Sequence, residues 1–516
     1  MKKLSFLTVI PLMAALGCEQ SKQSSVAAAN SLMTEELFHE IVDRLDQHYR
    51  PIIAQHGAEL VLKVDWASTT ENASAPKDGN DWIINIFGGM ARNEFMTPDG
   101  FALVLCHEMG HHLAGYPFKG SLDAASEAAA DYYAAQVCTK ELWRNDIQVN
   151  ATFRDAVDPK GKELCDAKWQ SEDEQNLCYR ITMAGLSWGL FSGRKEEIKP
   201  SIATPDTTTV EVTNTAYPSA QCRLDTYVQG ALCDHSFDHR IIPGRKTIAG
   251  KASLEAELEA IQNSCSEADG DKTGNRPRCW FNPRVFFPVD PVNVAHPGET
   301  ATQVAAGDTP TIDLSLVNRG RRDVEDFTVS VQPKHSDLTS SSSSQSTGIL
   351  HSNADIDFPT KLKVSADVEC GTRLDYDLIF TRGDLRQAFT RSLRVGTLNE
   401  SLIVEKSGTL AVFLGNGPEV EYAIDVDASD AEILFFDLNM VFFDTRYLTM
   451  SIESPAGTKF PLHNGEPGFD LFKAYEIKVP SGESASGQWK LRMKSNAMIA
   501  GVLTGLKVNA ARAICN

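Results

Sequence analysis

Two histidines and a glutamate stand at a spacing that suits metal chemistry. His107, Glu108 and His111 form a His-Glu-x-x-His pattern inside the largely apolar segment 101–112. In a helix, residues four apart lie one turn apart on the same face, so both imidazoles can bind one metal ion. Glu108 can then take a proton from an attacking water as general base. The alternative, a metal-free cluster inside a core helix, is disfavoured because buried polar groups without partners cost free energy.

A catalytic zinc site of this type needs a third protein ligand and keeps one open position. The alanine-rich stretch 126–134 favours a helix and carries Glu127 and Asp131 at i and i+4. We predict that Glu127 completes the metal site and that Asp131 accepts the outward N–H of a ligand histidine. The alanines between them would let this helix approach the first one closely. Two alternatives stay open, namely Asp123 as the third ligand, and Glu127 with Asp131 on a solvated face.

The elements that must position these residues have their own signals. Thr97 is a good N-cap, Pro98 suits the first helical position, and Asp99 favours the positive end of the helix dipole. Gly115 allows the metal helix to end. Just before this helix, the apolar run 82–87 predicts a strand, stopped by two glycines.

Two longer helices are predicted on either side of the metal helix. Segment 33–56 buries one face, because apolar residues recur at every fourth position, at Leu37, Ile41, Leu45 and Tyr49. Segment 171–191 opens with Ser171 and Glu174 at the spacing of a capping box. From about 33 to 281 the patterns are therefore mainly helical.

The sequence pattern changes from helical to strand-like near residue 283. Several prolines between 283 and 297 mark a linker, and strand-like alternation follows, for example at 309–316 and 327–331. The serine-rich run 339–347 lies between strand-like segments and predicts a mobile loop. A second β unit begins near 398.

The last β unit contains two recognisable strands. Segment 448–458 alternates and ends in a Ser-Pro-x-Gly-Thr turn, and 487–493 reads Gly-x-Trp-x-Leu. This pattern resembles the P domain of subtilisin-like convertases, a jelly-roll β-sandwich, over about 110 residues. The unit before it looks like a generic immunoglobulin-like sandwich. Plain sandwiches that act only as spacers are the alternative for both units.

The predicted fold is therefore multidomain. The expected units are an α+β, mainly helical zincin-like metallopeptidase domain at 33–285, an immunoglobulin-like β-sandwich at 286–397, and a jelly-roll, P-domain-like β-sandwich at 398–516. A length of 516 residues exceeds what one core supports.

The first residues predict export. Lys2 and Lys3 precede a short apolar run that ends at Cys18, so we expect a signal peptide at 1–17 and a tether at 18–32. The pattern resembles a bacterial lipobox, with Cys18 as the lipidated residue. The following Glu19 is not Asp, which favours the outer membrane by resemblance to enterobacterial sorting. An ordinary secretory peptide with an incidental cysteine is the alternative.

Composition supports an exported, soluble body. The formal net charge of -20 argues against a nucleic-acid partner, because phosphate binding needs clustered Lys and Arg. Eleven cysteines, with Cys18 set aside, leave an even number for disulfides in an oxidising compartment. The pairs expected from sequence proximity and from the two metal helices are Cys165–Cys178, Cys222–Cys233, Cys265–Cys279 and Cys106–Cys138, with Cys370 and Cys515 left over.

The metal-binding motif resembles that of a known family. The His-Glu-x-x-His pattern followed by Glu127 and Asp131 resembles gluzincins of the HtpX and CAAX-prenyl-protease type (peptidase family M-48), over roughly residues 33–240. The resemblance implies one zinc ion per chain and an edge strand at 84–91 that pairs with substrate backbone. It also implies two helper residues. Tyr217 stands where the family has the His of a His-Pro motif, and Arg223 matches a following Arg.

The function implied by the resemblance is zinc-dependent endopeptidase activity in the bacterial cell envelope, on exported or envelope proteins. The expected partners are a protein or peptide substrate and a membrane reached through the lipid anchor, without nucleic acid. Glu108 would act as base and Tyr217 could donate to the oxyanion, although a packed aromatic is the alternative for Tyr217. The competing function is a lipid-anchored binding or adhesion protein with a degenerate protease domain.

Overall fold

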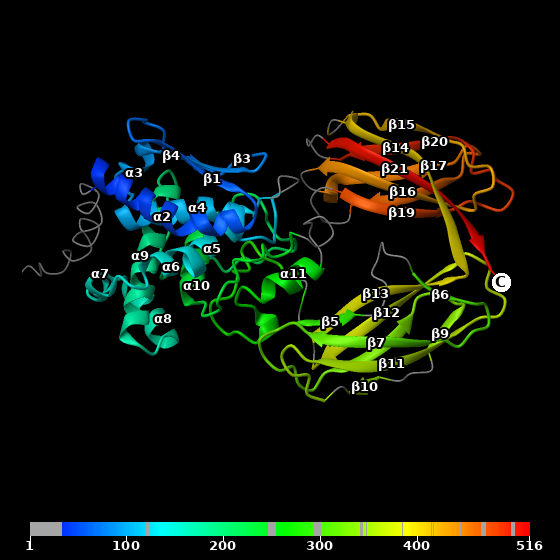
Figure 1. Cartoon of the computed structure of the whole chain (residues 1–516), viewed down its shortest axis with the longest axis horizontal. Coiled ribbons are helices and arrows are strands. Elements are labelled where there is room, and N and C mark those ends of the chain that lie inside the picture. Colours follow the sequence, from blue (N-terminus) through cyan, green and yellow to red (C-terminus); the bar gives the residue numbers. More distant parts are fainter. Residues whose placement is uncertain are drawn as a thin grey trace, which may run out of the picture.

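The chain folds into a helical part followed by a β-rich part with several sheets (Figure 1). The computed structural model describes residues 33–119, 124–245, 254–283, 285, 287–292, 301–340, 344–346, 348–383, 385–413, 415, 417–442, 445–465, 471–496 and 501–515. The predicted signal peptide, the tether with Cys18 and the alternative ligand Asp123 lie outside these residues. The predicted multidomain organisation, a helical part followed by a β-rich part, is confirmed.

Helices dominate the chain as far as residue 283. They are α2 (Glu35–Gln55), α3 (Gly88–Ala91), α4 (Pro98–Leu113), α5 (Glu127–Tyr133), the π-helix η2 (Ala134–Cys138), α6 (Thr139–Trp143), α7 (Ile147–Ala151), the 3-10 helix η3 (Thr152–Arg154), α8 (Pro159–Lys168), α9 (Glu172–Ser192), α10 (Ala220–Leu232), α11 (Leu254–Ile261) and the 3-10 helix η5 (Glu267–Asp269). Within the described ranges, no helix has both the length and the apolar character that a membrane crossing needs.

The ends of the predicted helices follow their capping residues. The hydroxyl of Thr97 accepts the N–H of Gly100 at 3.0 Å, and α4 starts at the proline that follows Thr97. The same helix ends just before Gly115, whose φ is +73°. In α9, the hydroxyl of Ser171 accepts the N–H of Glu174 at 3.3 Å. These local predictions are confirmed because capping uses only neighbours in the sequence.

Helices α5, η2 and α6 follow one another without a break and pack against α4. Gly110 of α4 lies against the backbone of Ala130 in α5, where a side chain on Gly110 would meet atoms 2.8 Å away. The predicted close approach of the two helices is therefore present, with a glycine on one side and alanines on the other. The Cys106–Cys138 disulfide, with a Cα–Cα distance of 5.5 Å, fixes α4 to the π-helical turn.

A small sheet lies beside α4. It has the order β1-β4-β2, with β3 also pairing β4, and its strands are β1 (Glu59–Asp65), β2 (Ala73–Ser74), β3 (Lys77–Asp78) and β4 (Asp81–Phe87). The predicted edge strand at 84–91 is wrong. Strand β4 pairs with β1 along its whole length on one side and with β2 and β3 on the other, and residues 88–91 form helix α3. Both edges of β4 therefore already have partners, so substrate backbone cannot pair there.

Strands take over after residue 287 and form two pairs of sheets. The first pair holds β5 (Val289–Val292), β6 (Thr302–Val304), β7 (Thr311–Asn318), β8 (Thr328–Pro333), β9 (Leu338–Ser340), β10 (Gln345–Ser346), β11 (Asp355–Val364), β12 (Arg373–Arg382) and β13 (Leu385–Val395). Their orders are β10-β8-β12-β13-β6 and β5-β7-β11-β9, and both sheets contribute to one hydrophobic cluster. The run 339–347, predicted as a loop, contains parts of β9 and all of β10.

The second pair of sheets shares a separate hydrophobic cluster. Its strands are β14 (Thr397–Phe413), β15 (Val420–Val426), β16 (Ile433–Phe442), β17 (Leu448–Glu453), β18 (Lys459–Asn464), β19 (Leu471–Lys478), β20 (Gly487–Ser495) and β21 (Gly501–Ile514), with a 3-10 turn η6 (Thr445–Tyr447). The orders are β14-β21-β16-β19 and β15-β20-β17-β18. The two strands singled out in the sequence, β17 and β20, are antiparallel neighbours.

Five disulfides cross-link the described chain. The expected pairs Cys106–Cys138 and Cys165–Cys178 are confirmed, and the two leftover cysteines pair as Cys370–Cys515. The expected pairs Cys222–Cys233 and Cys265–Cys279 are wrong, because the bonds are Cys222–Cys279 and Cys233–Cys265.

The physical reason for this error is the length of α10. Cys222 lies in its first turn and Cys233 just past its end. A rise of about 1.5 Å per residue puts them roughly 16 Å apart, well beyond the reach of a disulfide. Proximity in sequence was therefore misleading.

Candidate metal centre

The structure brings His107, His111 and Glu127 together. Their ligand-type atoms all lie within 4.8 Å of one another. Nε2 of His107 is 3.5 Å from Oε2 of Glu127, and Nε2 of His111 is 3.8 Å from Oε1 of the same carboxylate. Helix α4 supplies both imidazoles from one face, and the first residue of α5 supplies the carboxylate.

This donor set fits a metal ion of the zinc type. Two imidazole nitrogens and one carboxylate oxygen are ligands that zinc prefers, and a tetrahedral site with bonds of about 2.1 Å holds its ligand atoms about 3.4 Å apart. The distances of 3.5 and 3.8 Å are close to that edge length. They exceed the 2.7–3.2 Å of ordinary N–H···O hydrogen bonds. The three residues can therefore hold one such cation with small adjustments.

Asp131 stands behind the first histidine. Its Oδ1 lies 2.7 Å from Nδ1 of His107, on the side of the ring away from Glu127. Arg223 of α10 holds the same carboxylate with two hydrogen bonds of 2.7 and 2.8 Å, and the hydroxyl of Tyr227 also donates to it. Asp131 is fully buried. An anchored carboxylate in this position fixes the orientation and tautomer of the imidazole.

The second histidine has a different support. Nδ1 of His111 lies 2.8 Å from the carbonyl oxygen of Ala125, in the loop before α5. Backbone carbonyls, like carboxylates, commonly accept the second N–H of a metal-binding histidine. Both rings are therefore oriented so that Nε2 faces Glu127.

The electrostatics of the two imidazoles differ. Burial lowers the pKa of His107, but the Asp131 and Glu127 carboxylates outweigh burial and raise it to about 9. Burial and the neighbouring charge of His107 lower the pKa of His111 to about 4. Without a metal ion, the cluster thus holds a protonated His107 between the carboxylates of Glu127 and Asp131.

Glu108 lies beside the cluster without being part of it. It is buried, with 6% of its surface exposed, and burial raises its pKa to about 7. A carboxyl group poised near neutrality is well matched to taking and returning a proton. Glu108, adjacent to His107 in α4, is therefore a candidate general base.

Lys119 and Tyr217 form the exposed side of the centre. Nζ of Lys119 is 2.7 Å from Oε1 of Glu127, and it lies over the ring of Tyr217, 4.9 Å from the centroid. Tyr217 is 67% exposed, so it is not the packed aromatic considered as the alternative. Burial of the hydroxyl end and the charge of Glu127 raise the pKa of Tyr217. The phenol therefore stays protonated and can donate a hydrogen bond.

Sequence reasoning placed Arg223 near the site but missed three partners. Tyr227 was detectable, since it lies four residues after Arg223 on the same face of α10. Lys119 and the carbonyl of Ala125 belong to the connection between α4 and α5, where no pattern marks a role. The neighbouring His112 is not a ligand, because its ring stacks on Trp82 at 5.3 Å and its Nε2 lies 3.1 Å from the carbonyl of Ile83.

Comparisons with known proteins found only weak likenesses. No protein-family profile and no curated protein matches the chain. Solved structures that share partial likeness include a serine protease of Aeromonas sobria (13% identity over 23% of this chain and 28% of that chain, TM-score 0.20) and the secreted serine protease VesC of Vibrio cholerae (12% over 40% and 48%, TM-score 0.16). A third is BuGH86 in complex with neoagarooctaose (11% over 40% and 33%, TM-score 0.19). The chain spans under half the length of each, and likenesses this weak carry no argument about fold or function.

Proposed function

We propose that the chain is a zinc-dependent metalloendopeptidase similar to the HtpX and CAAX-prenyl-protease type of gluzincin. The observation that carries the proposal is the convergence of Nε2 of His107, Nε2 of His111 and the Glu127 carboxylate within 4.8 Å. Asp131, 2.7 Å from Nδ1 of His107, would be the supporting carboxylate, and Glu108, next to His107 in α4, would be the general base.

The proposed reaction is hydrolysis of a peptide bond. Zinc, when bound by the two histidines and Glu127, supplies a Lewis acid for the scissile carbonyl and the attacking water. Glu108 accepts the proton of that water on a carboxylate oxygen and returns it to the nitrogen of the leaving amine. Tyr217, exposed and protonated, would donate a hydrogen bond to the developing oxyanion. Asp131, held by Arg223, keeps His107 in its binding orientation.

The proposal includes the finer fold and the location. The helical part with its small sheet would be a zincin-like domain, and the two pairs of sheets would be an immunoglobulin-like and a P-domain-like sandwich. The mature protein would be anchored in the bacterial envelope, in the outer membrane, by lipid on Cys18. Replacing Cys18 by Ser should then release the protein from the membrane fraction, whereas a soluble parent protein would refute the anchor.

Two substitutions test the catalytic assignment. Glu108→Gln keeps the size of the side chain and removes the base, so zinc should stay at about one per chain while peptide hydrolysis falls by at least ~100-fold. Glu127→Ala removes a metal ligand, so both zinc and activity should be lost. Zinc is measured by mass spectrometry and hydrolysis with casein in parallel. A parent protein that binds no zinc, or a Glu108→Gln protein that cleaves at the parent rate, would reject the proposal.

The helper tyrosine has its own test. Tyr217→Phe should lower kcat by roughly 10- to 1,000-fold and change KM little, because an oxyanion contact exists only in the transition state. An unchanged kcat would remove Tyr217 from the mechanism and leave the metal site unaffected.

A further inference from the structure

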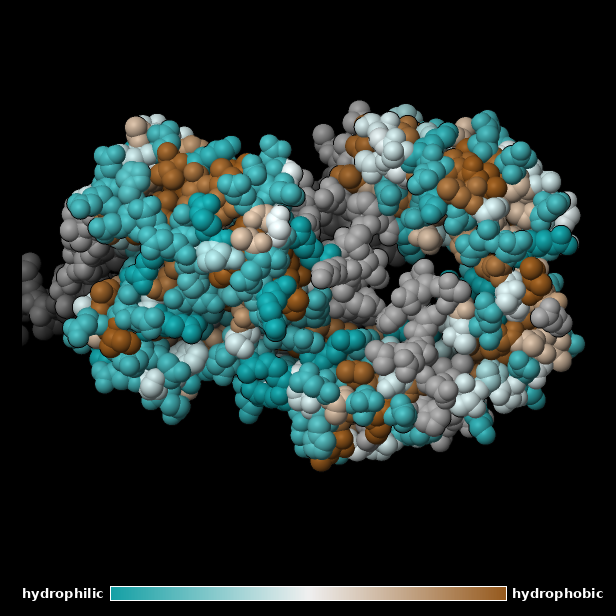
Figure 2. Space-filling view, in the orientation of Figure 1, coloured by the Kyte–Doolittle hydropathy of each residue, from teal (hydrophilic) through white to brown (hydrophobic). Residues whose placement is uncertain are grey.

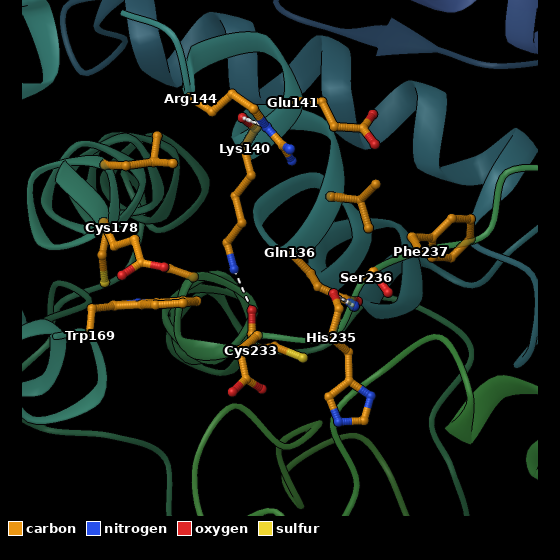
Figure 3. A pocket seen from close by; sticks show the side chains of 15 residues that line it. Gln136, Lys140, Glu141, Arg144, Trp169, Cys178, Cys233, His235, Ser236 and Phe237 are labelled. Atoms are coloured by element: carbon orange, nitrogen blue, oxygen red, sulfur yellow. Dashed lines mark hydrogen bonds between the residues drawn. The ribbon is translucent and has the colours of Figure 1, made fainter. Parts of the chain in front are cut away.

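A cavity apart from the candidate metal centre lies beside α6. This helix is the last of three, α5, η2 and α6, that follow one another from Glu127 without a break and form one helical rod. The cavity has a volume of about 510 Å³ and lies between α6, α9 and the segment 233–237 (Figure 3). Lys140 of α6 comes thirteen residues after Glu127 in the rod, which corresponds to roughly 20 Å along its axis. Neither metal-binding histidine lines the cavity. The cavity is therefore a separate feature from the metal centre.

Lys140 enters the cavity without a counter-ion. Its ammonium donates to the carbonyl oxygens of Gly230, at 3.2 Å, and of Cys233, and lies 5.0 Å from the centroid of the Trp169 ring (Figure 3). Within the described residues, no carboxylate comes within ion-pair distance of Lys140. Burial lowers the pKa of Lys140 to about 7, and the negative charge of nearby Asp234 offsets only part of this effect.

Two further hydrogen-bond donors at the cavity, Arg144 and the indole of Trp169, have no carboxylate acceptor among the described residues. Arg144 follows Lys140 by one helical turn and is exposed, and its guanidinium donates from Nε to the backbone oxygen of Lys140, at 3.4 Å. The indole Nε1 of Trp169 is buried and has no hydrogen-bond partner. A buried donor without an acceptor, such as this indole nitrogen, is rare in folded proteins and needs an explanation.

The carboxylates of the wall are already occupied. Asp234 pairs with Lys168 at 3.0 Å, and Glu174 accepts the hydroxyl of Ser171 at 2.6 Å. Glu141 accepts from Tyr49 at 2.9 Å and contacts two histidines on its other side. The buried ammonium of Lys140 and the indole Nε1 of Trp169 are thus left without an anionic acceptor in the wall, and a ligand with negative charge would supply one.

We propose that this cavity binds a small organic carboxylate that carries an apolar or aromatic group, such as the C-terminal residue of a peptide. The carboxylate would accept from Lys140, Arg144 and the Trp169 indole, and the apolar group would lie against Trp169, Leu177 and Phe237. An inorganic anion would leave most of the 510 Å³ unfilled. Pockets of this size with aromatic walls and a few fixed polar groups suit organic ligands. The site is independent of whether the metal centre is catalytic.

Calorimetry on the full-length protein tests the proposal. The probe is N-acetyl-phenylalanine, and its neutral amide is the matched control ligand. We expect one molecule of the acid to bind per chain and the amide to bind at least ~10-fold more weakly, since hydrogen bonds to charged groups are worth about that factor or more. Because carboxylates also bind zinc, the titration is repeated with Glu127→Ala, which should bind the acid as the parent does at this cavity.

Variants locate the binding site. Arg144→Gln is exposed and Trp169→Phe keeps the aromatic wall, so both should fold and each should weaken binding of the acid by about 10-fold. Lys140→Met should weaken it further, and Lys162→Met, on α8 away from the cavity, should have no effect. Equal binding of acid and amide, or unchanged binding in Arg144→Gln and Trp169→Phe, would overturn the proposal. Inorganic phosphate binding as tightly as the acid would overturn the organic assignment.

Discussion

The close contact between α4 and α5 makes Gly110 a sensitive position. A methyl group on Gly110 would lie 2.8 Å from both Cα and the carbonyl oxygen of Ala130. Nonbonded carbons pack at about 3.5–4.0 Å, so the two backbones must separate by roughly 1 Å in Gly110→Ala. These backbone atoms cannot turn aside as a flexible side chain can. The substitution therefore moves the helices rather than a rotamer.

The consequence reaches the proposed metal ligands, because α4 carries both histidines and α5 begins with Glu127. A separation of about 1 Å exceeds the ~0.2 Å tolerance of metal–ligand distances. We expect zinc affinity to fall by at least ~10-fold, although all three ligands remain. Overpacking also costs about 1–3 kcal/mol of unfolding free energy, which corresponds to a fall in Tm of roughly 3–10 °C for a part of this size.

The assay combines zinc titration against a competing chelator with thermal unfolding. Gly161→Ala is the matched control, since a methyl group there meets its nearest atoms at 3.4 Å, an ordinary contact, inside helix α8. That variant should keep the zinc affinity and lose little or no stability. If Gly110→Ala binds zinc as tightly as the parent, the close packing of α4 and α5 does not position the site and the reasoning is refuted.

Three further predictions concern other parts of the structure. Asp131→Asn should weaken zinc binding by about 10- to 100-fold in chelator competition, because the supporting charge behind His107 is lost; unchanged affinity would contradict that role. Burial raises the pKa of Glu141, but hydrogen bonds from His239, a second histidine and a tyrosine outweigh it and lower the pKa to about 2. The ionised Glu141 carboxylate therefore stabilises the fold above about pH 4.5, and this contribution is lost as the pH falls towards 2. Glu141→Gln, measured with a chelator present to remove metal, should therefore flatten the pH dependence of Tm between about pH 4.5 and 2. Removing the Cys370–Cys515 bond, which closes a sequence separation of 145 residues, should cost about 2–5 kcal/mol in denaturant unfolding of the β-rich part and leave zinc stoichiometry unchanged; loss of zinc would contradict this division.

The sequence by itself determined the local parts of the candidate metal centre. Helical periodicity requires residues four apart to share a face, so His107 and His111 had to lie together once α4 formed. The cap at Thr97 and the stop before Gly115 depend on near neighbours only, and both are present. The change from helical to strand patterns near 283 depends on period and composition, which are likewise local properties.

Only the tertiary structure decided which distant groups meet. The sequence allowed Glu127 as a ligand or as an exposed residue, and the packing of Gly110 on Ala130 placed it opposite the histidines. The cysteine pairs were misassigned where α10 separates neighbours in sequence. The role of Lys119 likewise depends on contacts that no period or spacing encodes.

The strand β4 shows the same limit. Its apolar run predicted a strand correctly, because β propensity and burial are visible in the sequence. Whether a strand lies at an edge or inside a sheet depends on which other segments pair with it, here β1 on one side and β2 and β3 on the other. Pairing joins residues that are distant in sequence, so a single sequence carries little information about it, and the three-dimensional packing decides it.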